Sequence, residues 1–186
     1  LGAPVGHARA EGESEFGLVS TGTPERGRHA DSAALGDVDG DGRSDLVVAS
    51  STRGADAGRR LEIRLRRDGA TVFPTAPDHV LDLTPDVVAF SVGDVAAAKG
   101  AEVVLFTATG AFAWSVSAPA DARPTKLVAA DFLWQLPHPR EVFHWDRGSR
   151  DVTGDGLADL LLPGPSGYLV ATQRRTAAGV TFDVSD

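Results

Sequence analysis

The sequence of 186 residues contains no cysteine. This absence excludes disulfide bridges, thiolate metal sites and cysteine nucleophiles together. Long apolar runs are also missing, because no uncharged segment approaches the ~20 residues that a helix needs to cross a bilayer. We therefore expect no membrane insertion. The sequence does not open with a basic segment followed by an apolar one, so we expect any export signal to lie outside it.

Positive charge is scarce: 18 Lys and Arg residues stand against 26 Asp and Glu residues, for a net charge of −8. Seven of the acids lie in two short segments, at Asp37, Asp39, Asp41, Asp45, Asp151, Asp155 and Asp159. Without these seven side chains the net charge of −8 would be −1. The rest of the chain is nearly neutral and offers no basic field, so we expect no nucleic-acid partner.

A sustained helical period of apolar residues is the third absence, and we expect very little helix. Short segments with alternating or β-branched apolar residues are present instead, separated by turns that use many of the 21 Gly and 11 Pro residues. These patterns are typical of short strands. The sequence therefore predicts an all-β fold, and its length has room for one domain with a sizeable core.

The segment "LGDVDGDGRSDLVVAS", residues 35–50, places four aspartates within nine positions and then becomes a strand. Calcium takes about 6 to 8 oxygen ligands, and alternate residues of a tightly curled loop can supply them together. The predicted ligands are the side chains of Asp37, Asp39, Asp41 and Asp45 and the main-chain carbonyl of Arg43. Gly42 permits the sharp turn. Without a cation the four carboxylates would repel one another, so we expect metal binding to stabilise the fold.

A second loop of this kind occurs in "RDVTGDGLADLLLPG", which begins at Arg150. Its predicted ligands are the side chains of Asp151, Thr153, Asp155 and Asp159 and the main-chain carbonyl of Leu157. Thr153 replaces an acid with a neutral oxygen, so we expect weaker binding there. Gly156 supplies the turn.

A degenerate copy, "VGDVAAAKGAEVVLF", lies between these two loops. Asp94 and Glu102 occupy the first and ninth places, but Ala96, Ala98 and Gly100 offer no side-chain oxygens, so we expect no metal there. The first acids of the three loops, at positions 37, 94 and 151, are separated by 57 residues in each case. This regular spacing indicates an internal repeat.

Two other structures could account for the acidic loops. Asp-Gly pairs favour turns without any metal. An EF-hand needs a bidentate Glu at position twelve and a helix on each side, whereas that position holds Val48 or Leu162, each inside a predicted strand. We therefore favour calcium loops over both alternatives.

Four short strands in each period are typical of a β-propeller blade. We expect about three four-stranded blades at residues 29–86, 87–142 and 143–186, and residues 1–28 as a possible outer strand of a preceding blade. Propellers close with about 4 to 8 blades, so these units would form an incomplete or partial propeller. We expect further blades of a longer chain, or another copy of it, to cover the exposed edges.

Other chemistry is weakly indicated. His138, His144 and Asp146 could imitate a metal cluster, but their spacing matches no metal geometry, and we expect a polar surface loop. The aromatic side chains could stack on sugars, although burial between blades is the better interpretation for each; they are Trp114, Trp134, Trp145 and Tyr168. No nucleophile elbow or phosphate loop is present, so we expect no catalytic site.

The two acidic motifs resemble the calcium loops of FG-GAP repeats, also called VCBS or integrin-α-type repeats, and the resemblance extends over residues 29–186. It implies a β-propeller with calcium between the first and second strands of a blade, and an extracellular or cell-surface location. We expect a non-catalytic calcium-binding module for adhesion or for recognition of a protein or carbohydrate. The alternative is an accessory or partial propeller domain of a secreted carbohydrate-active enzyme, a lyase or a hydrolase.

Overall fold

The computed structural model describes residues 27–53, 58–119, 121–129, 141–164 and 167–185. Within these ranges the chain forms 13 β-strands and no helix, and hence no helix able to span a membrane. The all-β prediction is confirmed for this part of the chain. The strand predicted within residues 1–28 lies almost entirely outside the described residues.

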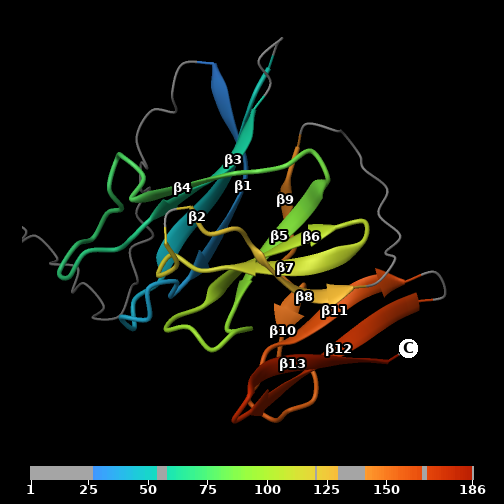
Figure 1. Ribbon diagram of the computed structural model, residues 1–186. Helices are drawn as coiled ribbons and strands as arrows, with labels where there is room; N and C mark the ends of the chain where they lie inside the picture. The colour runs from blue at the N-terminus through green and yellow to red at the C-terminus, as the bar shows by residue number, and fades with distance from the viewer. Residues whose placement is uncertain (1–26, 54–57, 120, 130–140, 165–166, 186) are drawn as a thin grey trace, which may run out of the picture.

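The strands form three sheets in chain order, which Figure 1 shows as separate layers. Sheet 1 contains β1 (Arg28–Gly36), β2 (Asp45–Thr52), β3 (Arg59–Arg64) and β4 (His79–Asp82). Sheet 2 contains β5 (Val87–Gly93), β6 (Glu102–Thr107), β7 (Gly110–Trp114), β8 (Thr125–Ala129) and β9 (Phe143–His144). Sheet 3 contains β10 (Ser149–Arg150), β11 (Asp159–Gly164), β12 (Gly167–Thr176) and β13 (Gly179–Ser185). From β1 to β4, from β5 to β8 and from β10 to β13, consecutive strands pair antiparallel, as in propeller blades.

The short strand β9 lies in sheet 2, although the sequence analysis placed residues 143–144 in the third blade. It runs parallel to β5, with Phe143 opposite Ala89 and His144 opposite Phe90. The N–H of Trp145 also donates to the carbonyl of Phe90, at 2.8 Å. The chain thus passes along the free edge of β5 before sheet 3 begins, and this pairing gives main-chain polar groups on that edge a partner.

Sheet 2 lies between sheets 1 and 3 (Figure 1) and packs against both. All six residues of β6 are buried, and alternate side chains point to opposite faces. Val103 and Leu105 pack toward sheet 1, whereas Val104 and Phe106 pack toward sheet 3. Their buried partners are Val47, Ala49, Leu61 and Ile63 in sheet 1 and Leu160, Leu162 and Ala171 in sheet 3. A strand buried on both faces is apolar throughout, which explains the run "VVLF".

The two acidic loops and the degenerate loop occupy the same place in each sheet. Each connects the first strand to the second, because Gly36 pairs with Asp45, Gly93 with Glu102, and residue 150 with residue 159. The 57-residue spacing of the sequence therefore corresponds to equivalent hairpin loops in three successive sheets.

Candidate metal centre

The acid at the ninth position of each loop is buried, and its carboxylate accepts a hydrogen bond from the main chain of the same loop. The three residues are Asp45, Glu102 and Asp159, with relative exposures of 0%, 1% and 0%. Each carboxylate accepts the main-chain N–H of the residue seven positions earlier, at 2.9 Å for Asp45, 2.9 Å for Glu102 and 3.1 Å for Asp159. This shared bond closes the loop in all three repeats, whether or not the other acids are present.

Two of these acids also reach the third strand region of their sheet. The second oxygen of Asp45 accepts the N–H of Arg66 at 2.8 Å, and that of Asp159 accepts the N–H of Gln173 at 2.9 Å. Burial raises the pKa of the Asp45 carboxyl, although the main-chain N–H donors oppose this shift. From the sequence we predicted Asp45 and Asp159 only as metal ligands. The structure shows that both also accept main-chain hydrogen bonds that hold the loop to its sheet.

The first loop gathers three carboxylates around one point. Single oxygens of Asp37, Asp39 and Asp45 all lie within 4.8 Å of one another. Oxygens that share a calcium ion at about 2.3 to 2.6 Å have separations of this size. Among the described residues, no other three acidic or histidine side chains come together in this way. The donor set of hard oxygens therefore fits one calcium ion.

The first loop is curled by Asp37 and two glycines. The Asp37 carboxylate accepts the N–H groups of Asp41 at 2.9 Å and Gly42 at 2.8 Å. Gly40 and Gly42 have φ angles of 71° and 88°. A side chain at either position would be strained, because left-handed backbone disfavours Cβ. The turn assigned to Gly42 lies where the sequence analysis placed it.

Asp41 is not part of the three-carboxylate group. One of its oxygens forms an ion pair with the Arg43 guanidinium, and the other accepts the Arg43 N–H at 2.9 Å. Asp41 would need another rotamer to act as a fourth side-chain ligand. The main-chain carbonyl of Arg43 stays a predicted ligand. The Arg43 side chain, which the sequence analysis did not consider, would compete with a bound cation for Asp41.

The loop at residues 151–159 is more exposed to solvent than the first loop. Asp151 and Asp155 are exposed, and Asp151 accepts the N–H groups of Gly156 at 2.8 Å and Gly154 at 2.6 Å. These bonds lower the pKa of the Asp151 carboxyl. Asp155 accepts the N–H of Leu157 at 2.9 Å.

The Thr153 hydroxyl lies 3.5 Å from a carboxylate oxygen of Asp151, at the limit of a hydrogen bond. The predicted ligands of this second loop therefore lie on one hairpin. Its three carboxylates do not come as close to one another as those of Asp37, Asp39 and Asp45 in the first loop. The first loop is thus closer to a formed metal centre.

The degenerate loop packs directly against the first acidic loop. The N–H of Ala101 donates to the carbonyl of Asp37 at 2.7 Å. A Cβ atom at Gly100 would lie 2.6 Å from the carbonyl oxygen of Val38 and 2.7 Å from the nitrogen of Gly40. The loop that lacks the middle acids thus supports the one that retains them. No pattern in the sequence indicated this contact, because it depends on how closely two sheets approach.

The histidine candidates do not form a metal cluster in the described part of the chain. His144 lies in β9 and packs on Phe90, with ring centroids 5.3 Å apart. Burial lowers the pKa of His144, although the charge of Asp146 opposes this. His138 lies outside the described residues.

The aromatic side chains are divided between the core and the surface. Trp114 is 8% exposed and packs between sheets 1 and 2. Trp145 contacts Phe106, with centroids 5.8 Å apart. Tyr168 is 60% exposed, and Trp134 lies outside the described residues. Trp114 is thus buried and Trp145 partly buried, whereas Tyr168 is open to solvent.

The fold and this loop define a class: an all-β repeat protein of blade-like sheets with acidic loops between first and second strands. The FG-GAP repeat family matches residues 29–60, which include nearly all of β1, the first acidic loop, β2 and the start of β3. The chain therefore contains an FG-GAP repeat. Repeats of this family occur in propellers and in extracellular or cell-surface proteins, and they are generally structural modules. No curated protein and no solved structure matches the chain.

Proposed function

We propose that this chain is a calcium-binding recognition module of a secreted or cell-surface protein, with its principal metal centre in the first acidic loop. The observation that carries the proposal is the convergence of Asp37, Asp39 and Asp45 oxygens within 4.8 Å. The FG-GAP repeat at residues 29–60 includes this loop. We propose a non-catalytic role in which the sheets present a surface to a protein or carbohydrate.

In this proposal the three gathered carboxylates bind the ion, Asp41 rotates from Arg43 to join them, and the Arg43 carbonyl completes the protein ligands. The ion would offset the repulsion among the acids and hold the loop against its neighbour. The loop at residues 151–159 would bind more weakly, since its carboxylates must first be drawn together.

A calcium titration of thermal stability tests the proposal. At a calcium concentration about 100 times the Kd, binding stabilises the folded state by about 2.7 kcal/mol, which raises the Tm by several degrees. The variant Asp39→Ala should lose most of this response. The exposed Asp121, outside all three loops, provides a matched control, and Asp121→Ala should respond as wild type does. A well-folded wild type with no calcium response would reject the proposal.

We also propose that another blade covers the outer face of sheet 3. Val95 of the middle loop is fully buried in the cluster shared with sheet 3, whereas its equivalent 57 residues later, Val152, is 44% exposed. Val104 is fully buried, whereas its equivalent Leu161 is only half-buried. In sheet 2, Val95 and Val104 pack against the next sheet. Their equivalents in sheet 3 have no such neighbouring sheet among the described residues. A longer chain or a second copy would supply it.

A further inference from the structure

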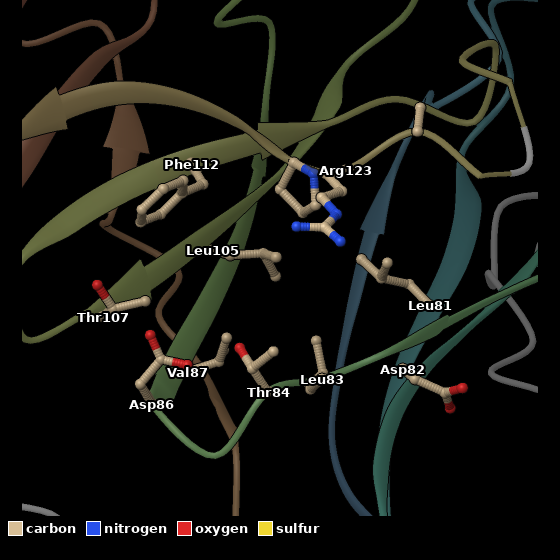
Figure 2. A pocket seen from close by; sticks show the side chains of 12 residues that line it. Leu81, Asp82, Leu83, Thr84, Asp86, Val87, Leu105, Thr107, Phe112 and Arg123 are labelled. Carbon is tan, nitrogen blue, oxygen red and sulfur yellow. The ribbon is translucent and has the colours of Figure 1, made fainter.

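A cavity of about 600 Å³ opens between sheets 1 and 2, and it extends from the ends of β5 and β6 that lie opposite the acidic loops to the segment before β8. The loops join β5 and β6 at the Gly93 and Glu102 pair, whereas the cavity is lined by Val87 and Thr107, which pair at the other end. Figure 2 shows this space from close by. The cavity therefore shares no residue with the candidate metal centre.

Most of the cavity wall is apolar. Leu81 and Leu83 line it from sheet 1 and the segment after β4. Val87, Leu105 and Phe112 line it from sheet 2 (Figure 2). Binding sites for small molecules are typically about 300 to 1,000 Å³ in volume, mainly apolar, with a few polar groups that orient the ligand. This cavity has that size and composition.

Arg123 is the one basic side chain among the residues that line the cavity. In Figure 2 its guanidinium is directed into the space between Leu105 and Leu81. It forms no hydrogen bond or ion pair with the part of the chain that the structure describes. Of the two acids on the wall, Asp86 interacts electrostatically with Arg59, and Asp82 points away from the centre of the cavity in Figure 2.

The floor of the cavity is held in place by Arg59. Its guanidinium donates to the carbonyls of Val87 at 2.9 Å and Thr84 at 2.6 Å. The N–H of Val87 donates to the carbonyl of Thr84 at 3.2 Å, and the N–H of Leu83 donates to the carbonyl of Arg59 at 2.9 Å. These bonds fix the connection between sheets 1 and 2, so a ligand would meet a preformed wall and lose less free energy in ordering it.

We propose that this cavity binds an amphipathic monocarboxylate, a small molecule with an apolar chain or ring and a single carboxylate. The apolar part would lie against Leu83, Leu105 and Phe112, and the carboxylate would pair with the Arg123 guanidinium. A planar guanidinium can bind a carboxylate through two parallel hydrogen bonds. A ligand with a second negative charge would be disfavoured, because Asp86 lies on the same wall.

Octanoate is a suitable probe, with octanol and octylamine as ligands of the same chain length but different head groups. Each is titrated into the calcium-free protein in EDTA, and binding is followed by backbone amide chemical shifts. We expect octanoate to bind about tenfold or more tightly than octanol, because a charge-assisted hydrogen bond contributes at least that factor. The shifted amides should lie in residues 81–87, 105–112 and 122–124.

The variant Arg123→Gln should reduce octanoate affinity to that of octanol and leave octanol binding unchanged. The exposed Arg150 of sheet 3 provides the matched control, and Arg150→Gln should bind octanoate as wild type does. The proposal is overturned if octanoate does not bind, if octanol binds equally well, or if the two arginine variants lose the same affinity. Because the experiment excludes calcium, its outcome is independent of the proposed metal centre.

Discussion

At the scale of single residues, Asp45 combines two roles that the sequence pattern does not separate. It is one of the three gathered carboxylates, and it also accepts main-chain N–H groups from Val38 and Arg66 while fully buried. Asp39 belongs to the same group but is only half-buried and accepts an N–H that Asp37 also accepts. Replacing the two acids should therefore have different effects in the absence of metal.

We predict that Asp45→Ala lowers the free energy of unfolding in EDTA by about 2 to 4 kcal/mol, because the buried N–H of Val38 and the part-buried N–H of Arg66 lose their acceptor. Asp39→Ala should lower it by less than about 1 kcal/mol, since the donor keeps another acceptor. Both variants should lose the calcium response. Urea denaturation with and without calcium measures this, and equal losses in EDTA would show that Asp45 has no separate structural role.

Glu102 closes the degenerate loop with a longer side chain than the aspartates of the other loops. Its carboxylate accepts N–H groups from Val95 and Ala96 with one oxygen, while the other oxygen is buried and has no partner among the described residues. Burial raises the pKa of the Glu102 carboxyl above its usual value of 4.5. The folded protein thus holds this proton more tightly than the unfolded chain does.

The sign of the pH dependence follows from this difference. A raised folded pKa means that ionisation of Glu102 costs stability as the pH rises from the unfolded pKa through the folded pKa. Glu102→Gln cannot ionise, so we predict that it gains stability relative to wild type as the pH rises from about 4.5 through the raised folded pKa to about pH 8, and that below about 4.5 the difference no longer changes. Denaturation curves of both proteins across this range measure the difference. A pH-independent difference would contradict the prediction.

At the scale of elements, the first acidic loop depends on its neighbour in sheet 2. Gly40 and Gly100 approach each other so closely that a Cβ on either would lie under 3.0 Å from the other's main chain. The Ala101 N–H bond to Asp37 adds a direct link to the residue that curls the acidic loop. The middle loop therefore supports the first acidic loop even though its own inner positions carry no acids.

Gly100 and Gly156 offer a matched comparison, with φ angles of 88° and 85°. Alanine at either position adds backbone strain of about 1 to 2 kcal/mol. Only Gly100 has main-chain atoms within reach of a new Cβ, whereas Gly156 faces open space. We predict that Gly100→Ala costs a further ~1 to 3 kcal/mol and weakens calcium binding by the first loop. Isothermal titration and denaturation measure both effects, and equal losses would exclude the contact as their cause.

The sequence predicted those elements whose conformation depends on residues close together in the chain. Alternating residues and the 57-residue spacing predicted the strands and the three equivalent loops, and Gly42 has the turn conformation expected of it. Three features were not predicted. The pairing of β9 with β5 and the contact at Gly100 arise from the approach of segments far apart in the chain. The turn of Asp41 toward Arg43 reflects competition between two partners of one carboxylate, which loop spacing does not show.

At the scale of the whole molecule, stability depends on two interfaces that share β6. Phe106 is fully buried in the interface with sheet 3 and contacts Trp145, while its neighbour Leu105 packs toward sheet 1. In repeat proteins each unit is stabilised mainly by its direct neighbours. A cavity on one face of β6 should therefore affect one outer sheet more than the other.

We predict that Phe106→Ala costs about 3 to 5 kcal/mol, the usual range for a buried aromatic side chain. Hydrogen exchange of β11 and β12 should increase more than that of β2 and β3, because the cavity lies on the side of sheet 3. Mass spectrometry of exchanged peptides measures this distribution. A uniform increase would indicate that the three sheets open as one unit.

The outer face of sheet 3 provides a further test. Among the described residues, Val152 and Leu161 have no neighbour like the one that covers their equivalents. We therefore predict that the isolated chain binds a hydrophobic dye such as ANS. Val152→Lys combined with Leu161→Lys should remove most of this signal, and sedimentation will show whether a second copy covers the face. Absence of dye binding by a monomeric wild type would argue against an uncovered interface.

The position of β9 in sheet 2 indicates where the chain could be split into two fragments that reassemble. β8 and β9 belong to the same sheet, and β9 pairs with β5 at the edge opposite β8, so a cut between β8 and β9 leaves strands of sheet 2 on both fragments. Two fragments split there would each carry part of one sheet and matching apolar surfaces. They should reassemble when co-expressed, which makes this junction a natural site for a split-protein reporter.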